Sequence, residues 1–389
     1  MKINSNVVRI FALFIITLVF VSLFSAISTS IWKGGEEKIH APGEFIIDED
    51  MTIAEFGKKN DIPAPVLARV FGLKNKQDRE KSIPEYNMSA TQITQETNKA
   101  LALYYENKSK NWIKIVIKFM LWFLFLAVVF VLMRKSLITP KLRKWLYAVS
   151  IIIFGIALGS DPSPMGTVKD AVALYGANRV IFMPRMIALF VFLLLVVIAN
   201  KYICSWGCQL GVLQDFIFRL NRNKSDTKGI IRQYKLPFVV TNGIRISFFI
   251  IFTLIAFTWA TDIFEHIDPF KYYNPAILTA VSWVFILAIL VLSLFVYRPW
   301  CHLFCPFGLV GWIFEKLSIY RIKVNYDTCI ACKACAKACP SNVMDAILRR
   351  ENVIPDCFAC ATCIKVCPTG SIEFKAGKRE LPPEGKFER

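Results

Sequence analysis

The stretches CIACKACAKACP at residues 329–340 and CFACATCIKVCP at residues 357–368 decide the fold of the C-terminal part of this chain. Each stretch has three cysteines at two-residue gaps and a fourth cysteine further on, which is followed by proline. This run is typical of iron–sulfur ligation, in which the fourth cysteine binds the neighbouring cluster. Zinc sites favour separated C-x-x-C pairs instead. The spacing therefore predicts two [4Fe-4S] clusters.

The crossed pattern assigns four cysteines to each cluster, three from one stretch and one from the other. For the first cluster we predict the ligands Cys329, Cys332, Cys335 and Cys367. For the second cluster we predict the ligands Cys357, Cys360, Cys363 and Cys339. We expect an α+β domain like the bacterial 2[4Fe-4S] ferredoxins over residues 321–375, followed by a polar tail over residues 376–389.

The other four of the 12 cysteines lie in an internal repeat. KYICSWGCQLG at residues 201–211 aligns with RPWCHLFCPFG at residues 298–308 at a constant offset of 97. Cysteines four residues apart on a helix face the same side. Two facing pairs would give a four-thiolate site, which we interpret as a third iron–sulfur centre with the ligands Cys204, Cys208, Cys301 and Cys305. A redox-active dithiol, a transient copper site, zinc and unligated structural pairs remain open.

The composition indicates a membrane protein. Hydrophobic residues make up 55% of the 389 residues, and the net charge is +18. Uncharged runs of about 20 residues are long enough to span a bilayer. We predict a polytopic α-helical membrane protein with about six transmembrane helices, which are Ile10–Trp32, Trp112–Met133, Trp145–Ser160, Met183–Ile203, Leu236–Ala260 and Tyr272–Tyr297.

The basic residues favour one orientation in the membrane. They are concentrated in residues 134–144, 201–235 and 298–389, which alternate with segments near neutrality. Loops rich in Lys and Arg stay in the cytoplasm. We therefore expect a multi-pass protein of the cell (inner) membrane with both termini and the ferredoxin domain in the cytoplasm. The positive charge reflects topology, so we predict no nucleic-acid partner.

This orientation divides the remainder of the chain into three parts. We expect an N-terminal membrane anchor over residues 1–31, for which a cleaved signal peptide is the alternative. Residues 32–111 are predicted to form a small extracytoplasmic helical region, which is either a spacer or a docking module. Thr52 and Glu55 fit a capping box at the start of its first helix. Residues 112–320 form the predicted membrane domain, with five helices and the two C-x-x-x-C elements.

Arg245 lies about nine residues into the fifth predicted span. An intramembrane arginine is costly and therefore a candidate functional residue. It could offset the charge of a thiolate cluster or donate a hydrogen bond to a quinone, and Asn242 one turn earlier could assist. The alternative is that its side chain extends to the membrane surface. No catalytic residue is assigned.

With these motifs the chain resembles the membrane polyferredoxins of the NapH type, which are related to the membrane half of NosR-type proteins. The resemblance covers roughly residues 120–375 and depends on the two C-x-x-x-C elements and the double ferredoxin run. One departure is Gln209, which stands where the second element has Pro306. Another is that no large flavin-binding domain of the NosR kind fits in residues 32–111.

The resemblance implies a membrane-bound iron–sulfur electron-transfer protein. It would pass electrons between the quinone pool and a respiratory reductase system, as a quinol dehydrogenase component. Its redox partner would be an extracytoplasmic ferredoxin, a cytochrome or a reductase. Two alternatives remain. One is an assembly factor or metal reductase for a respiratory metalloenzyme, with copper at the four repeat cysteines. The other is a redox-responsive regulator that signals through residues 32–111.

Overall fold

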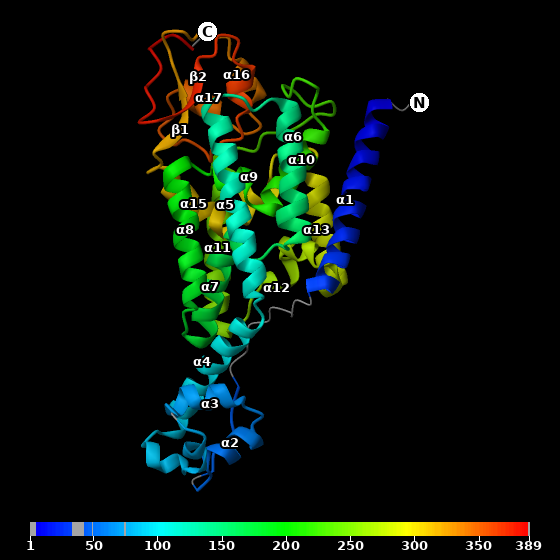
Figure 1. The fold of residues 1–389 in the computed structure, drawn as a ribbon. Coiled ribbons are helices and arrows are strands. Elements are labelled where there is room, and N and C mark those ends of the chain that lie inside the picture. The colour runs from blue at the N-terminus through cyan, green and yellow to red at the C-terminus, as the bar shows by residue number, and fades with distance from the viewer. Residues whose placement is uncertain (1–4, 33–42, 49, 74, 388–389) are drawn as a thin grey trace.

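The structure, a computed structural model, describes residues 5–32, 43–48, 50–73 and 75–387. The chain forms three parts along one axis, and Figure 1 shows a helical bundle between two smaller domains. The C-terminal domain covers one end of the bundle, which we call the ferredoxin end. A small helical domain lies beyond the other end, where α5 begins at Trp112, and we call this the distal end.

In the part of the chain that the structure describes, three helices of the bundle are long and apolar enough to cross a membrane: α1 (Ser5–Trp32), α5 (Trp112–Arg134) and α11 (Phe238–Trp259). Two shorter apolar helices accompany them, α8 (Met183–Ala199) and α13 (Ala280–Leu292). Many large apolar side chains on these helices are exposed, which suits surfaces that contact lipid. The chain is therefore mostly helical with candidate membrane helices, and the predicted count of six spans stays a prediction.

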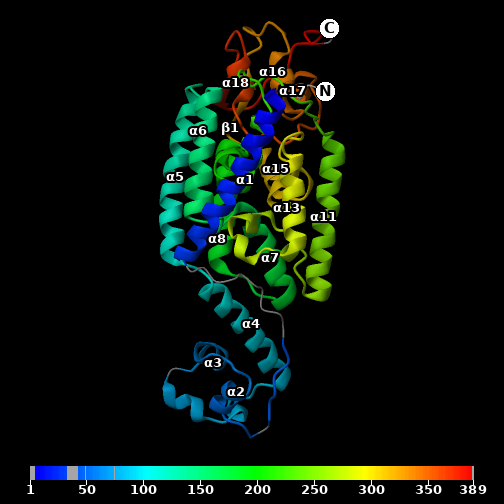
Figure 2. The same ribbon diagram turned by 90° about the vertical axis from the view of Figure 1, so that its right-hand side faces the viewer.

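The helix α1 lies along the outside of the bundle. It contacts the π-helical segment η3 (Ile151–Ala157), α10 (Gln209–Leu220) and two short 3₁₀ helices, η4 (Pro269–Tyr273) and η5 (Pro275–Ile277). Figure 2 shows α1 in front of the other helices of the bundle. Tyr272 in η4 donates a hydrogen bond of 2.8 Å from its hydroxyl to the Leu18 carbonyl. This contact fixes α1 against the segment that precedes α13.

Two parts of the bundle differ from the sequence-based expectation. The predicted span Trp145–Ser160 is α6 (Pro140–Ser150) continued by η3, so it begins earlier and its second half is π-helical. Residues 161–185, which lie largely between two of the predicted spans, contain the helix α7 (Pro164–Asn178), which packs against α8 and α11. A Cβ atom at Gly176 would lie 2.7 Å from the Ala256 carbonyl oxygen of α11, so this close approach requires glycine.

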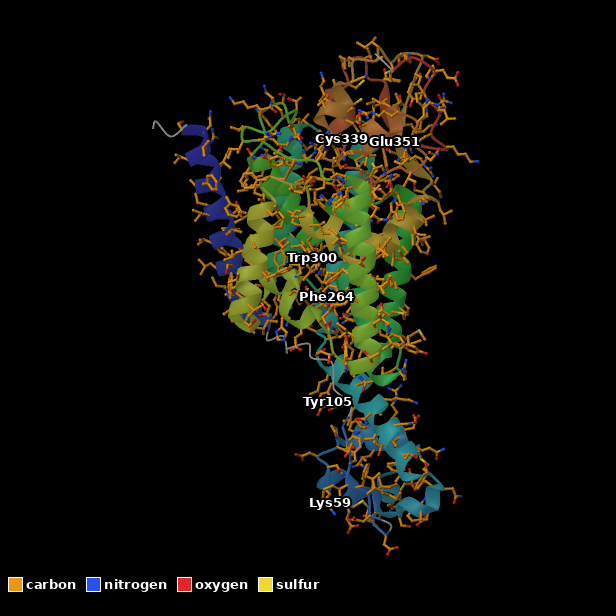
Figure 3. All side chains as sticks on the ribbon, turned by 180° about the vertical axis from the view of Figure 1, so that it is seen from behind. Lys59, Tyr105, Phe264, Trp300, Cys339 and Glu351 are labelled. Atoms are coloured by element: carbon orange, nitrogen blue, oxygen red, sulfur yellow. The ribbon has the colours of Figure 1, made fainter. Side chains whose placement is uncertain are left out.

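The repeat extends beyond the cysteine motifs. In the first copy α8 is followed by α9 (Tyr202–Trp206) and α10. In the second copy α13 is followed by α14 (Pro299–Leu303) and α15 (Pro306–Glu315). The first residues of each matching pair are 97 positions apart, as in the motifs themselves. Trp300 in α14 lies in the interior of the bundle beside Phe264 of α12 (Phe264–Ile267), as Figure 3 shows.

The small helical domain contains α2 (Ile53–Lys59), α3 (Ala64–Phe71), α4 (Ala90–Lys108) and the 3₁₀ helices η1 (Lys76–Glu80) and η2 (Ile83–Tyr86). Thr52 and Glu55 form the predicted capping box at the start of α2. Helix α4, which the sequence analysis did not predict, begins at a second capping box, Ser89 with Gln92. The domain has its own apolar core, which includes Ile53, Phe56, Val66, Leu67, Ile93 and Leu101.

The C-terminal domain is α+β, as predicted. Strand β1 (Tyr320–Val324) pairs antiparallel with β2 (Ile372–Ala376), with Val324 opposite Ile372. Three short helices lie between the strands: α16 (Ala334–Ala338), α17 (Val343–Leu348) and α18 (Thr362–Val366). The strand pair brings the chain before Cys329 next to the chain after Cys367, which closes the domain around its cysteines.

Candidate iron–sulfur sites

The two ferredoxin stretches follow the same unusual backbone path. In the first, Ala331 and Lys333 have φ angles of 54° and 56°. In the second, the equivalent residues Ala359 and Ala361 have φ angles of 48° and 62°. The left-handed region is costly for residues other than glycine, and such strain clusters at functional sites. The left-handed residues at equivalent positions bend each set of three cysteines into a tight loop. A loop of this shape is suited to binding a cluster.

Four cysteines line one cavity in this domain, and they are Cys339, Cys357, Cys360 and Cys363. This set is the one predicted for the second cluster, including the ligand that crosses over from the first stretch. The other four cysteines also lie near one another, because Cys335 interacts electrostatically with Cys329, Cys332 and Cys367. Both predicted sets are therefore brought together. Cys335 also interacts with Cys363, so the two sets are neighbours.

The choice of a cubane over zinc at both ferredoxin sets comes from the cysteine spacing. A mononuclear zinc site has four ligands around one ion. A cubane holds its four thiolates around a larger core of iron and sulfide, and three cysteines followed by a trailing cysteine and proline are typical of it.

The C-x-x-x-C elements correct one expectation, because neither cysteine pair lies on a single helix. Cys204 lies within α9, but Cys208 is the N-cap of α10. Cys301 lies within α14, but Cys305 is the N-cap of α15. In the second element the physical reason is Pro306, which has no N–H and cannot continue a helix. The break places the second cysteine of each pair at a helix N-terminus, where the helix dipole favours a thiolate.

All four repeat cysteines are buried, and the fold brings them together. The Cys305 thiol has electrostatic interactions with Cys204, Cys208 and Cys301. The Gly308 amide donates a hydrogen bond of 3.3 Å to the Cys305 sulfur, and the Gly211 amide donates to Cys208 in the same way. Amide donors of this kind tune thiolate ligands in iron–sulfur centres. The four thiols therefore form a third candidate centre, which lies within the bundle.

The glycine in each element has no room for a side chain. A Cβ atom on Gly211 would lie 2.4 Å from the Cys204 carbonyl oxygen. One on Gly308 would lie 2.7 Å from the Cys301 carbonyl oxygen. Because these are backbone contacts, an added methyl group would move the cysteine segment itself. Gly211 therefore allows α10 to pack closely on the Cys204 segment, and Gly308 allows α15 to pack closely on the Cys301 segment.

The two repeat copies hold one another through equivalent basic residues. Lys201, three residues before Cys204, donates a hydrogen bond of 2.7 Å from Nζ to the Gly308 carbonyl of the second copy. Arg298, three residues before Cys301, donates one of 2.6 Å from Nη1 to the Cys204 carbonyl of the first copy. Both side chains are fully buried. The two elements therefore form one unit.

The second ferredoxin stretch docks directly on this unit. Lys201 forms an ion pair with Asp356, and the Trp206 indole donates a hydrogen bond of 3.2 Å to the Ala359 carbonyl. The Phe358 ring lies 4.9 Å from the Arg298 guanidinium and 5.2 Å from the His302 ring. The loop that carries Cys357 and its neighbours is thus packed against residues from both repeat copies.

Arg245, a predicted site residue, also contacts this loop. Its Nη1 lies 3.0 Å from Asp356 Oδ2, and its Nη2 donates a hydrogen bond of 2.7 Å to Asn242 Oδ1. The side chain is 1% exposed, so it does not extend to the surface as the alternative interpretation requires. The structure therefore pairs Arg245 with a carboxylate of the C-terminal domain and with Asn242.

A buried charge network beside the second ferredoxin loop was not predicted. Asp215 on α10 accepts hydrogen bonds from Arg298 (2.7 Å), Arg219 (2.7 Å), Tyr147 (2.8 Å) and Tyr297 (3.0 Å). The sequence contained one signal for it, since Asp215 and Arg219 are spaced four apart on a helix. The partners from α6 and from the segment before α14 are distant in the chain, which sequence spacing does not reveal.

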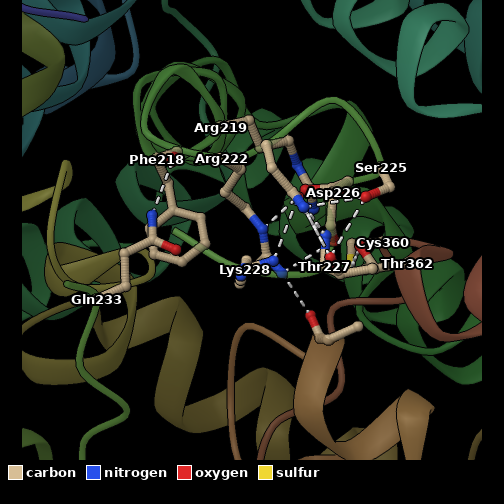
Figure 4. Close-up of polar contacts among 12 residues, drawn as sticks. Phe218, Arg219, Arg222, Ser225, Asp226, Thr227, Lys228, Gln233, Cys360 and Thr362 are labelled. Carbon is tan, nitrogen blue, oxygen red and sulfur yellow. Dashed lines mark hydrogen bonds and ion pairs between the residues drawn. The ribbon is translucent and has the colours of Figure 1, made fainter. Parts of the chain in front are cut away.

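The network continues at Asp226, which forms ion pairs with Arg143, Arg219 and Arg222. Figure 4 shows Asp226 with Arg219 and Arg222. Arg219 and Arg143 also interact electrostatically with Cys360. Arginine residues outnumber aspartate residues in the network around Asp215 and Asp226. A cationic layer therefore faces the second ferredoxin loop, where an anionic cluster would be bound.

Glu315, at the end of α15, is a second residue that the sequence analysis missed. Its carboxylate is buried and accepts a hydrogen bond of 3.2 Å from the Cys357 backbone amide. Burial raises the pKa of Glu315 to about 8. The residue orients the backbone at the first cysteine of the second stretch.

Family models agree with these sites. A model described as a 4Fe-4S binding domain matches residues 322–345, within the C-terminal domain. Another model with the same description matches twice, at residues 181–228 and 278–325. The two matches begin 97 residues apart and each contains one C-x-x-x-C element. They support the internal repeat and its assignment to iron–sulfur proteins.

Curated relatives include three proteins that align with about half of this chain. YccM of Escherichia coli K12, named as a candidate electron transport protein, is 29% identical over 41% of this chain and 46% of its own length. The ferredoxin-type protein NapH of Haemophilus influenzae is 26% identical over 44% of this chain and 54% of its own. The regulatory protein NosR of Pseudomonas aeruginosa is 24% identical over 56% and 32%.

These matches support a membrane ferredoxin protein of the NapH and NosR type. The aligned part spans about half the length of the first relatives, 46% of YccM and 54% of NapH. No solved structure matches this chain.

Proposed function

We propose that this chain, an iron–sulfur electron transport protein similar to NapH and NosR, passes electrons between the quinone pool and a respiratory reductase system. The observation that carries the proposal is the docking of the second ferredoxin loop, residues 356–360, on both C-x-x-x-C elements. Two redox sites in direct contact are what electron transfer within one chain requires. The name of YccM and the iron–sulfur family models agree with this role.

The proposed ligand sets are the ones that the cysteine spacing predicts. One [4Fe-4S] cluster is held by Cys329, Cys332, Cys335 and Cys367. A second is held by Cys339, Cys357, Cys360 and Cys363, which line one cavity. A third iron–sulfur centre is held by Cys204, Cys208, Cys301 and Cys305. When bound, these centres supply reversible one-electron chemistry.

The chain itself performs three tasks around these centres. The Gly211 and Gly308 amides donate to cysteine sulfurs, which stabilises the thiolate form. Lys201 and Arg298 place positive charge beside both the repeat cysteines and the second ferredoxin loop. Burial of all four repeat cysteines excludes water from the contact between the sites. Together these features hold the redox sites in a fixed and dry arrangement.

We further propose the topology that the charge distribution predicts. Both termini and residues 321–375 would lie in the cytoplasm, and residues 32–111 would lie on the other side of the cell membrane. The separation of the two end domains by the bundle supports this arrangement. A redox partner outside the cytoplasm would then dock on the small helical domain.

Metal analysis of anaerobically purified protein tests the proposed function. Three clusters require about 12 irons per chain and two require about 8, because each cubane has four. We expect about 12, and about 8 in a Cys204→Ser, Cys301→Ser double variant that keeps the ferredoxin electron paramagnetic resonance (EPR) signals. Ser293→Ala is the matched control, because the buried Ser293 hydroxyl donates only to the Ile289 carbonyl of its own helix. Iron-free protein would contradict the proposal, and copper at the four repeat cysteines would favour the metal-handling alternative.

A further inference from the structure

A cavity of about 190 Å³ lies at the distal end of the bundle, opposite the ferredoxin domain. It is enclosed by the end of α1, the start of α5, the loop before α7, and η4 with η5. Its wall includes Trp32, Lys114, Asp161, Phe270, Tyr273 and Asn274. None of the cysteines lines it, so it is separate from the iron–sulfur sites described above.

The size and lining of this cavity suit a small aromatic ring that carries polar groups. A cavity of about 150 Å³ is enough to hold benzene. Trp32, Phe270 and Tyr273 provide aromatic surface, whereas Lys114 and Asp161 provide charge. Seven charged side chains also line the cavity, and most of them are paired with one another, as in the ion pairs Lys110–Asp161 (3.2 Å) and Lys169–Asp170 (3.1 Å). The three aromatic rings are therefore the apolar surface that a ligand would contact. The volume accommodates one substituted ring, so a long apolar tail would lie outside the cavity.

One polar group in the wall is available to a ligand. The Asn274 side chain is half-buried, and in the described part of the chain it has no hydrogen-bond partner. Most other polar groups in the wall are engaged, as in the 3.1 Å ion pair between Lys169 and Asp268. An amide can donate to a carbonyl oxygen and accept from a hydroxyl group. Asn274 can therefore bind both the oxidised and the reduced form of a quinone ring.

The cavity is connected to the repeat cysteines through the protein. The Tyr273 ring lines the cavity, and its hydroxyl donates a hydrogen bond of 3.0 Å to the Gln209 carbonyl. Gln209 directly follows Cys208. The loop before α7, which also lines the cavity, is held by Lys118. This residue donates hydrogen bonds to the Gly159 (2.8 Å) and Asp161 (3.0 Å) carbonyls. A ring in the cavity would be separated from the Cys208 segment by little more than Tyr273.

The region around Arg245 is a poorer quinone site than the sequence suggested. Both terminal nitrogens of Arg245 already have partners, Asp356 and Asn242. A quinone oxygen would have to displace a buried ion pair to bind there, which is costly. The distal cavity, in contrast, combines space, an aromatic wall and a free amide.

We propose that the distal cavity binds the head group of a quinol. This inference rests on the proposed function, since the quinol is the source or product of the electrons that the chain carries. Oxidation of the quinol to the quinone breaks two O–H bonds and releases two protons and two electrons. The protons leave to water at the distal end, and the electrons pass one at a time to the iron–sulfur centres of the proposed function.

Photolabelling of the full-length, iron-loaded protein in lipid nanodiscs tests this site. The probe is a short-chain naphthoquinone with a photoreactive azide, used with and without excess unlabelled short-chain naphthoquinone. We expect competed labelling in residues 109–115, 158–170 and 268–277. Asn274→Leu should weaken labelling by about fivefold, the size expected for one lost hydrogen bond. Thr29→Trp, which fills the cavity from α1, should abolish it.

The matched control is Thr261→Leu, a polar-to-leucine change at the same end that does not line the cavity. Labelling that is absent, uncompeted, unchanged by both cavity variants, or confined to residues near Arg245 would overturn the inference. Iron content and EPR spectra are measured on the same samples. Loss of iron would count against the proposed function, whereas absent labelling of iron-loaded protein counts against the cavity alone.

Discussion

Arg245 of α11 and Asp356 of the C-terminal domain form an ion pair of 3.0 Å in which both side chains are 1% exposed. Asp356 also pairs with Lys201, so one carboxylate joins a membrane helix, a repeat element and the ferredoxin loop. Because Asp356 directly precedes Cys357, this contact fixes the position of a predicted cluster ligand. The ion pair therefore couples the attachment of the domain to the geometry of its redox site.

Asp356→Asn should loosen the C-terminal domain without removing any cysteine. The change leaves Lys201 and Arg245 buried without their counter-charge, and breaking a buried pair costs about 3–5 kcal/mol. We expect faster proteolysis between residues 316 and 325 and weaker EPR coupling between the second ferredoxin cluster and the repeat centre. The control is Asp345→Asn, which removes an exposed pair with Arg349. Equal effects of the two variants would refute the prediction.

Cys339→Ser should abolish the second cluster although Cys339 lies in the first stretch. The reason is that Cys339 lines the same cavity as Cys357, Cys360 and Cys363. Its EPR spectrum should match that of Cys360→Ser and differ from that of Cys332→Ser. A spectrum like that of Cys332→Ser would mean that each stretch holds its own cluster.

Gly211→Ala and Gly308→Ala should each damage the repeat centre. An added methyl group meets the Cys204 or Cys301 carbonyl at 2.4 or 2.7 Å, so the cysteine segment has to move. We expect loss of about four irons per chain, one cubane, with the ferredoxin signals retained. Gly243→Ala is the control, because a methyl group there meets no atom within 4 Å. Full iron content in both element variants would contradict the expectation.

Reporter fusions test the proposed orientation. Green fluorescent protein after residue 389 should fluoresce, and alkaline phosphatase after Lys108 should be active, because the phosphatase folds only outside the cytoplasm. Alkaline phosphatase fused after Arg134, one span later, should be inactive. The reverse pattern of phosphatase activity would place the ferredoxin domain outside the cytoplasm and remove the basis of the proposed function.

The parts of the fold that depend on local spacing could be predicted from the sequence. The cysteine runs indicated the α+β domain, the offset of 97 indicated the repeat, and Thr52 with Glu55 indicated the start of α2. Each of these signals lies within a few residues of chain or in a direct comparison of two stretches. These features could be predicted because the residues that form each sequence pattern are the same residues that form the structural feature.

Features that depend on contacts between distant segments were missed. Helix α7 could not be predicted because the length and charge of its sequence give no sign that it packs on α11. Asp215 binds Tyr147, Tyr297 and Arg298 from two segments that are distant in the chain, which no spacing rule reveals. The breaks at Cys208 and Cys305 were missed because the four-residue spacing also fits a continuous helix.

The reciprocal contacts of Lys201 and Arg298 have an evolutionary consequence. Each residue reaches a carbonyl of the opposite copy rather than of its own. A single ancestral unit would have made both contacts only by associating with a second identical molecule. Gene duplication and fusion would then have turned a symmetric dimer into one polypeptide, after which the two halves were free to acquire different neighbours, such as Asp356 on one side and Asp215 on the other.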